Sequence, residues 1–418
     1  MKHYDLIVVG GGFTGVCAAI AAAREKLSVL LIERTNCLGG APANNLVNPF
    51  MAYWTWKDDE KFYLSRGIFL EIAEELKNCG ALGENESTFD EEWLKLILNR
   101  MVLKEGIDLL FHSYLMDANV TDGNVTSITV ANKSGNQTFT ADFFIDATGD
   151  GDLAVLSGCP YHLGRPEDHL CQPMTLCFRL ANVDIEKFEK ARPIMDPLYQ
   201  EWQAAGKLKN PREDILIFGT MIDGVLHFNS TRIVKRNPVD AFDITAAEIE
   251  AREQVFELYH FLKENIDGFQ NAKLISTAMQ IGTRESRMIE GNYLLTSEDL
   301  VACTKFEDAI AEGNYDIDIH NPEGSGTSHY YFEEGTYYTI PYRCLCPKGT
   351  NNLWVAGRCI SSTHEAQASY RIMPICATLG QAAGTAAAVA KQTGTDANTL
   401  DVKKVQAHLP LHLSLIHI

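Results

Sequence analysis

Three glycines near the start of the chain have the spacing that brings a polypeptide backbone close to a nucleotide. Gly10, Gly12 and Gly15 form a G-x-G-x-x-G pattern between an apolar run and an alanine-rich segment. The first glycine permits a tight turn, the second lets the backbone approach a pyrophosphate, and the third lets a helix pack closely on a strand. The phosphates would then meet the free N–H groups and the positive end of the helix dipole.

An acidic residue stands where the ribose of such a nucleotide would lie. Glu33 closes the second apolar run, "SVLLIE". Its carboxylate can accept hydrogen bonds from both hydroxyls of an adenosine ribose, and it disfavours a 2′-phosphate, which argues against NADP. NAD and FAD share the adenosine half, so the choice between them must come from other residues.

The flanking segments supply the elements that would position this turn. Residues 5–9 are apolar enough for a buried parallel strand, residues 13–25 form a helix with small residues facing the sheet, and residues 28–33 form the next strand. Thr88 and Glu91 make a capping box before a helix with apolar residues at helical spacing. The runs "DLLFHS", "NVTSITVAN" and "TFTADFFIDAT" predict a small antiparallel meander inserted in this first domain.

A different pattern begins at about residue 160. Strand-like runs alternate with long amphipathic helices around 184–207 and 245–265, and residues 312–335 form a loop-rich insertion. Residues 351–358 then return to a buried strand, and a helix of small residues follows from Gly380.

We therefore predict an α/β protein. A Rossmann-like nucleotide-binding domain, a parallel sheet with an inserted β-meander, is built from both ends of the chain, and an α+β substrate domain is inserted in its middle. The expected limits are 1–158 and 341–408 for the two parts of the nucleotide-binding domain, and 159–340 for the inserted substrate or cap domain.

The composition of the chain indicates which partners and which cellular compartment to expect. The net charge of −19 argues against nucleic acid or an anionic membrane surface as the main partner. Eleven scattered cysteines, none spaced C-x-x-C, favour a reducing cytoplasm over a disulfide framework, and we expect no metal site. The uncharged runs 6–23 and 372–390 are rich in Gly and Ala, and a strand–turn–helix explains the first better than a membrane span. "MKHY" leads straight into the first strand, so we expect a cytoplasmic protein without a signal peptide.

Longer motifs occur in order along the chain: "VVGGGFTG", "ERTNCLGG", "DATGDGDLA", "QPMTLCFRL", "IGTRESRMIEG" and "NNLWVAGRCISSTHEAQASYRIMPICATLGQAAGTAAA". Through these motifs the sequence resembles the FAD-dependent oxidoreductases of the two-dinucleotide-binding-domain flavoprotein class. Within that class it is similar to the subgroup often labelled like the heterodisulfide reductase A subunit. The resemblance reaches to about residue 408 and implies FAD as the cofactor; it is much less specific for the substrate.

The resemblance places candidate FAD contacts at several turns. "LGGAPANN" would pass close to the pyrophosphate and the flavin, and Asp150, after a buried strand, could reach a phosphate-linked sugar or cap a helix. In related flavoproteins, a helix like the one expected to begin near Gly380 and Gln381 points its N-terminus at the flavin. Alternatively, Gly380 and Gly384 only allow close helix packing. The candidate FAD contacts are Gly10, Gly12, Gly15, Glu33, Arg34, Gly39, Gly40, Thr148, Gly149, Asp150, Gly357, Arg358, Gly380 and Gln381.

Departures from neighbouring families exclude some reactions. Flavin disulfide reductases carry a redox cysteine pair just after the double glycine, where this chain has Ala41-Pro42-Ala43. The only later candidate for a nicotinamide fold, residues 324–330, lacks the third glycine and a preceding strand. The heterodisulfide-reductase label usually comes with iron–sulfur clusters, but no cysteine run here could hold one, so the flavin is carried over and the clusters are not.

The segment 361–374 supplies the candidate catalytic residues. The resemblance brings it beside the flavin, and it contains His364, Glu365, Tyr370 and Arg371. Arg371 could hold a substrate carboxylate bidentately, and His364 could act as acid or base. The alternative is that His364 and Glu365 only brace the turn or touch the flavin.

Two further groups of polar residues are weaker candidates. For Arg284 and Arg287, a network of ion pairs with Glu285 that supports the domain junction is favoured over substrate contact. His227, Asn229 and Thr231 share one face of an alternating strand, which could face the active-site cavity.

These observations predict a flavoprotein oxidoreductase that transfers a hydride between a small organic substrate and bound FAD. An external electron donor or acceptor could be a further partner. One alternative is an electron-transfer subunit that works with a separate iron–sulfur protein. The other is a flavoprotein whose FAD is structural or serves a non-redox reaction.

The end of the chain has a separate origin in this interpretation. "LSLIHI", residues 413–418, is the translation of a common transposon-end sequencing adapter. We therefore expect 409–418 to be a truncated tail with adapter-derived residues 413–418, and assign no function to His412 or His417.

Overall fold

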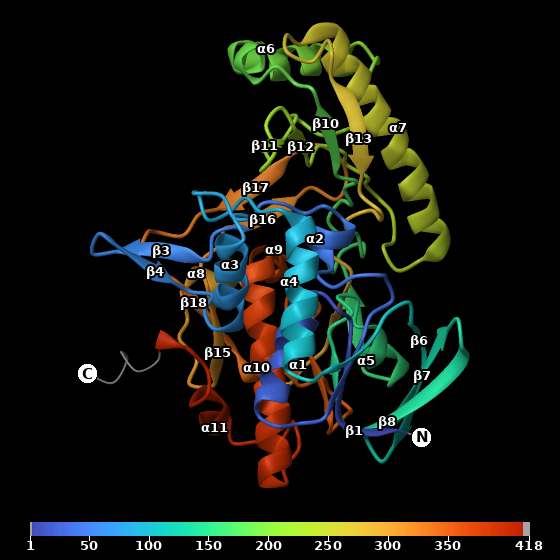
Figure 1. Ribbon diagram of the computed structural model, residues 1–418, viewed down its shortest axis with the longest axis vertical. Helices are drawn as coiled ribbons and strands as arrows, with labels where there is room; N and C mark the ends of the chain where they lie inside the picture. The colour runs from blue at the N-terminus through green and yellow to red at the C-terminus, as the bar shows by residue number, and fades with distance from the viewer. Residues whose placement is uncertain (1, 413–418) are drawn as a thin grey trace.

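The main body contains a parallel sheet with strands from both ends of the chain (Figure 1). In the computed structural model, which describes residues 2–412, its parallel strands follow the order β5 (Asp108–Leu110), β2 (Val29–Ile32), β1 (His3–Val9), β8 (Gly135–Asp146) and β19 (Leu353–Val355). Every residue of β2 and β19 is buried, as expected for strands covered on both faces. The predicted α/β class is confirmed.

The inserted meander shares its last strand with the parallel sheet. The first part of β8 pairs antiparallel with β7 (Asn124–Asn132), which pairs with β6 (Tyr114–Thr121). "DLLFHS" was wrongly assigned to this meander, because it contributes β5, which lies parallel to β2. A short apolar run carries no signal that distinguishes an edge strand of one sheet from a strand of the next.

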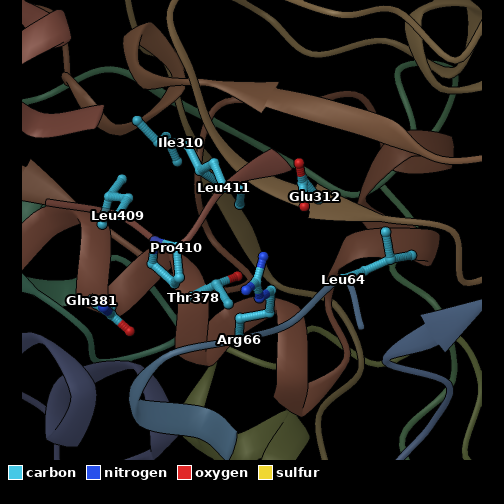
Figure 2. A pocket seen from close by; sticks show the side chains of 10 residues that line it. Leu64, Arg66, Ile310, Glu312, Thr378, Gln381, Leu409, Pro410 and Leu411 are labelled. Atoms are coloured by element: carbon cyan, nitrogen blue, oxygen red, sulfur yellow. The ribbon is translucent and has the colours of Figure 1, made fainter. Parts of the chain in front are cut away.

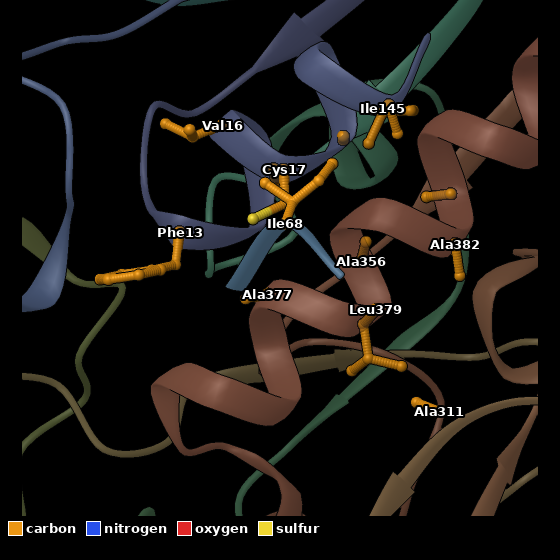
Figure 3. Close-up of a cluster of buried hydrophobic side chains, with 14 of the residues drawn as sticks. Phe13, Val16, Cys17, Ile68, Ile145, Ala311, Ala356, Ala377, Leu379 and Ala382 are labelled. Atoms are coloured by element: carbon orange, nitrogen blue, oxygen red, sulfur yellow. The ribbon is translucent and has the colours of Figure 1, made fainter. Parts of the chain in front are cut away.

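Two helices of small residues pack together on the sheet. Figure 3 shows Val16 and Cys17 of α1 (Phe13–Arg24) in one buried cluster with Ala377, Leu379 and Ala382 of α10 (Met373–Thr393). A Cβ atom on Gly380 would lie 2.0 Å from the carbonyl oxygen of Thr14, and one on Gly384 would lie 2.1 Å from that of Ala18. These two glycines therefore let the backbones of α1 and α10 touch.

The start of α10 differs from the prediction. The helix begins at Met373, with Ile372 as its N-cap and Pro374 in its first turn, where the fixed φ of proline suits a helix start. Gly380 and Gln381 lie in the helix interior, so the expectation that they mark its N-terminus was wrong. The run from Ile372 onward is uniformly apolar or small, which hides the helix start from periodicity.

We expect Gly380→Ala to destabilise the protein although alanine is the better helix former. The added Cβ meets the backbone of Thr14, which no side-chain rotation can relieve. Overpacking of this kind costs about 1–3 kcal/mol, against a gain in helix propensity of about 1 kcal/mol. Chemical denaturation should show a lower free energy of unfolding for Gly380→Ala, whereas Gln392→Ala, at an exposed site of the same helix, should match wild type. A Gly380→Ala protein as stable as wild type would contradict close packing as the reason for this glycine.

α10 is also the one helix within residues 2–412 that is long and apolar enough to cross a membrane by length and composition. Of its most apolar window, 89% is buried inside the protein. A core helix of a globular protein has these properties.

A cap lobe with its own core stands on the main body, at the top of Figure 1. Its antiparallel sheet follows the order β11 (Ile217–Gly219), β12 (Leu226–Phe228), β10 (Phe178–Ala181) and β13 (Lys273–Thr277). Helices α6 (Ile185–Ala204) and α7 (Ala241–Asn265) match the two predicted helices and bury their apolar sides against this sheet.

The lobe is smaller than the predicted insertion of 159–340. Its core draws on residues 174–281, whereas Leu295, Ile310 and Tyr338 belong to the core of the main body. The segment expected to be loop-rich contains a hairpin, whose first strand corresponds to the alternating run "DIDIH". The hairpin is formed by β16 (Ile317–His320) and β17 (Thr327–Tyr330). Two other antiparallel pairs lie outside the core of the lobe: β9 (Tyr161–Leu163) with β14 (Arg287–Ile289), and β15 (Ala309–Gly313) with β18 (Tyr338–Pro341).

One predicted helix cap was also wrong. Helix α4 (Glu91–Lys104) is capped by Asp90, whose carboxylate accepts from the backbone N–H groups of Glu92 and Trp93, rather than by Thr88. The remaining elements are α2 (Ala41–Asn44), β3 (Trp54–Lys57), β4 (Glu60–Tyr63), α3 (Ile68–Asn78), α5 (Asp152–Leu156), α8 (Ser297–Val301), the 3₁₀ helix η1 (Tyr342–Leu345), α9 (His364–Tyr370) and α11 (Val402–Gln406).

The last described residues pack back onto the main body. Figure 2 shows Leu409, Pro410 and Leu411 around a small pocket that Arg66 and Glu312 also line. The Nδ1 of His412 lies 2.7 Å from Glu312 Oε2. Residues 413–418, which we predict to be adapter-derived, lie outside the described residues.

Candidate active site

The glycine turn between β1 and α1 has no room for side chains. Gly10 has a φ of 104° and donates its N–H to the carbonyl of Ile32. A Cβ on Gly15 would lie 1.8 Å from the carbonyl oxygen of Gly10. The first N–H groups of α1 have no partner one turn earlier in the helix, which makes this end suited to phosphate.

The double glycine lies against the same turn. Gly39 donates to the carbonyl of Gly11 at 2.8 Å, and a Cβ on Gly40 would lie 2.8 Å from the Cα of Gly12. Gly39 and Gly40 have φ angles of 119° and 63°. Two separate segments of backbone thus come together where the sequence predicts the pyrophosphate.

Glu33 joins the end of β2 to the glycine turn. Its Oε2 accepts from the N–H of Gly11 at 2.6 Å, and its Oε1 accepts from the N–H and the hydroxyl of Thr35, both at 2.8 Å. The carboxylate is buried, and it lies at the wall of a cavity of about 390 Å³ that Gly10, Arg34 and Thr148 also line. This cavity continues from the predicted phosphate site past the predicted ribose position, so the residues present fit the adenosine half of FAD.

Asp146, at the end of β8, holds Thr148, which lines this cavity, and Asp146 was not singled out from the sequence. It accepts hydrogen bonds from the N–H and hydroxyl of Thr148 and from the N–H of Ala154, and its burial raises the pKa of the carboxyl to about 6. An acidic residue that ends a buried apolar strand, as in "FFIDATG", is the signal that could have identified it.

The loops after β8 and β19 are joined by a salt bridge between Asp150 and Arg358. Asp150 also accepts from the hydroxyl of Ser286 at 2.7 Å, and the N-cap of α5 is Gly151, so Asp150 does not cap that helix. Gly149 and Gly357 both have positive φ angles, and a Cβ on Gly149 would lie 3.1 Å from Arg358 Nε.

The predicted contacts in α10 have packing partners instead. Gly380 touches Thr14 in the first turn of α1, and the side chain of Gln381 accepts from the N–H of Ile68 at 2.9 Å. Gln381 lies in the pocket of Figure 2, which also holds the end of the described chain. A direct contact of either residue with FAD stays a prediction.

His364 begins α9 and forms a buried pair with Glu285. Its Nδ1 lies 2.8 Å from Glu285 Oε1, and the other carboxylate oxygen of Glu285 accepts from the N–H of Gln172. Burial opposes the charge of His364, but the hydrogen bond and the charge of Glu285 outweigh it and raise the pKa of the imidazole. The Nε2 atom makes no hydrogen bond with the described residues.

Arg371 lies at the other end of α9. Its Nη2 lies 3.2 Å from Asp318 Oδ2 in β16, while its buried Nε has no partner within residues 2–412. His364 and Arg371 are two helical turns apart, which corresponds to about 10 Å along the helix. The structure therefore places both on α9 but not in contact.

The salt-bridge network expected between Glu285 and the two arginines beside it, Arg284 and Arg287, does not form among the described residues. Arg287 instead pairs with Asp152 at 2.8 Å, and Arg284 donates to neutral oxygens of the cap lobe. Glu285 is taken by His364, a partner that spacing along the chain could not reveal.

The three predicted residues of the cap strand have different surroundings. Asn229 accepts from Arg284 at 3.2 Å, whereas the hydroxyl of Thr231 accepts from the N–H of Leu176. His227 is buried with neither ring nitrogen bonded to a described residue, and burial, with the charge of Arg179, lowers its pKa to about 3. Of the three, only Asn229 contacts the candidate site.

Comparisons with known proteins agree with this geometry. The sequence model of the family described as FAD dependent oxidoreductase matches residues 5–409. The chain is 26% identical over 158 residues to a soluble pyridine nucleotide transhydrogenase of Mycobacterium bovis, which covers 36% of this chain and 31% of that protein. It is 36% identical over 85 residues to dihydrolipoamide dehydrogenase of Chaetomium thermophilum, which covers 19% of this chain and 16% of that protein. The matches thus span less than a third of the length of either relative.

A solved structure shows the same fold. That of the flavin-dependent brominase Bmp2 has a TM-score of 0.50 at 12% identity, covering 97% of this chain and 82% of that one. Taken with the family match over almost the whole sequence, the glycine turn, Glu33 and the cavity beyond them have one explanation. The chain belongs to the FAD-dependent oxidoreductase family and uses FAD as its cofactor.

Proposed function

We propose that the protein transfers a hydride between a small organic substrate and its FAD. The observation that carries this proposal is the buried His364–Glu285 pair. Segment 282–287, which contains Glu285, also bonds to Arg358 and Asp150, at the ends of the strands that form the FAD-binding domain. A proton-carrying residue is thus attached to the cofactor side of the junction between main body and cap lobe.

The pair can move the proton that accompanies a hydride. Oxidation of a C–H bond next to an O–H or N–H group removes a hydride and a proton from the substrate. Bound FAD would supply the acceptor for the hydride. Glu285 fixes the imidazole through Nδ1, so Nε2 of His364 would take the proton. Because its pKa is raised, His364 can also hold a proton near neutral pH and return it in the reverse reaction.

Arg371 is proposed to contact the substrate from the other end of α9. Its Nη2 is engaged by Asp318, but its Nε is a buried donor without a partner in residues 2–412. We expect Arg371→Ala to lower kcat/KM roughly tenfold to a hundredfold with FAD still bound, because a buried charged contact is lost. Arg343→Ala, which removes a more exposed arginine paired with Asp308, should leave kcat/KM unchanged. Equal steady-state kinetics for wild type and Arg371→Ala would remove Arg371 from the site.

Two other functions share the fold and FAD. An electron-transfer subunit would pass electrons to a separate iron–sulfur protein, and a non-redox flavoprotein would cause no net electron change in its substrate. Oxidised and chemically reduced protein should therefore each be mixed, without oxygen, with a panel of small organic compounds and separately with a ferredoxin-type protein. Flavin reduction or reoxidation by a small compound supports the proposal. Exchange with the ferredoxin alone selects the first alternative, and product formation without electron change selects the second.

A further inference from the structure

Arg284 is an arginine at the domain junction without an acidic partner. Its Nη1 donates to the carbonyl of Pro173 and to the hydroxyl of Thr175, each at 2.6 Å, and its Nη2 donates to Asn229 Oδ1 at 3.2 Å. All three acceptors are neutral, and within residues 2–412 Arg284 forms no salt bridge. Its side chain is half-buried, and a charge withdrawn from water is normally matched by a partner.

The acids around Arg284 have other partners. Glu285, the next residue, is bonded to His364, and three further carboxylates pair with other arginines, as Arg212–Asp214, Arg232–Glu213 and Arg371–Asp318. Asp318 also accepts from the hydroxyl of Tyr315. Within residues 2–412 no carboxylate pairs with Arg284, and of the charged groups that act on it Arg371, Arg212 and Arg232 are positive and Asp318 is negative. Burial and the charge of Arg371 lower the pKa of Arg284 to about 9, so it remains a cation at neutral pH.

Other donors in the same cluster lack partners. The Nε of Arg371 and the Nη1 of Arg212 are buried and make no hydrogen bond with the described residues. Leaving a buried donor unpaired has a cost in free energy, and a group with several acceptor oxygens would remove it. A carboxylate has such oxygens and carries the missing charge, and arginine matches its geometry bidentately.

Arg284 also adjoins the proposed proton-transfer pair. The next residue, Glu285, holds His364, and the backbone carbonyl of Arg284 accepts from the side chain of Gln367 in α9 at 2.8 Å. On the cap side, Gly282 pairs with Thr175. Figure 1 shows α9 and the β16–β17 hairpin directly beneath the cap lobe. The backbone of Arg284 is thus held against α9, the helix that His364 begins and Arg371 ends.

We propose that Arg284 binds a carboxylate of the substrate, with Arg371 as a second donor, so that the substrates are small organic acids. This inference rests on the proposed function and deepens it by naming the substrate class. The neutral partners of Arg284 hold the guanidinium in place without cancelling its charge. The bound acid then supplies the counter-charge that the protein omits.

The test is ligand binding to the FAD-loaded protein, read from the change that each ligand causes in the flavin absorbance spectrum. The probes are acetate, benzoate and succinate, each compared with its uncharged amide at constant ionic strength. Wild type should bind at least one acid roughly tenfold or more tightly than the matching amide. Arg284→Met should lose roughly tenfold to a hundredfold of that affinity, and Arg284→Lys should lose less, because it keeps the charge without the bidentate geometry.

Arg236→Met is the matched control, since Arg236 lies in the cap lobe and pairs with Asp243. It should bind acids like wild type. Equal binding of acids and amides by wild type, which needs no variant, would overturn the proposal. So would an FAD-loaded, folded Arg284→Met protein that keeps wild-type affinity.

If acids bind through Arg284 but no electrons move, the carboxylate site stands and the proposed function fails. If an uncharged compound reduces the flavin and acids show no preference, the function stands and the carboxylate site fails.

Discussion

Glu33→Arg should purify with little or no FAD, whereas wild type should be yellow with about one FAD per chain. The carboxylate bonds to the N–H of Gly11 and to Thr35, and an arginine offers no acceptor for either. Each donor left unpaired costs about 1–3 kcal/mol. The new positive charge would also face Arg34, which lines the same cavity. The substitution would in addition remove the carboxylate that accepts from the ribose hydroxyls. Quantifying FAD released from the denatured protein measures the effect.

Two further variants separate the role of the carboxylate from a general effect of charge. Glu84→Arg makes the same charge change at an exposed site and should keep wild-type FAD content. Glu33→Gln keeps one acceptor oxygen and should bind an intermediate amount. A Glu33→Arg protein that keeps full FAD content would show that this strand end does not hold the ribose.

His364→Ala should lower kcat a hundredfold or more while FAD stays bound, since general acid–base catalysis contributes roughly 10²–10⁴-fold. The pH–rate profile should lose the limb that reports the imidazole. Glu285→Gln should retain that limb but move it to lower pH, because the carboxylate raises the pKa of His364 and a neutral amide does not. Steady-state kinetics over a range of pH measures both effects.

His408→Ala is the control for this pair, because it removes another imidazole that is held by a glutamate, Glu25, at the surface. It should leave both kcat and the pH profile unchanged. If His364→Ala turns over at the wild-type rate with its profile intact, the histidine only braces the start of α9. The proton would then have another acceptor.

The parts of the site that could be predicted from the sequence are those with a fixed local spacing. Gly10, Gly12, Gly15 and Glu33 are all set by one strand–turn–helix–strand unit, and the structure brings them together at one turn, where Gly10 and Glu33 line the cavity. The double glycine was found because it follows the same unit directly. In each case short-range geometry decides where the residue lies.

The parts that could not be predicted depend on contacts between distant segments. Glu285 and His364 are 79 positions apart, and no pattern in either segment names the other as its partner. Arg284 was grouped with Glu285 because they are neighbours in sequence, but their side chains have different partners. The start of α10 at Met373 was missed because an unbroken apolar run has no period to read.

The most direct test of the central claim is an anaerobic single turnover of the purified FAD-loaded protein. The protein is mixed with a small organic acid that binds it, and flavin absorbance and product are followed together. We predict that oxidised flavin disappears in step with product formation, with one product molecule per flavin reduced, or that reduced flavin is reoxidised with the same stoichiometry in the opposite direction. Product that accumulates while the flavin keeps its oxidation state would contradict hydride transfer between the substrate and FAD.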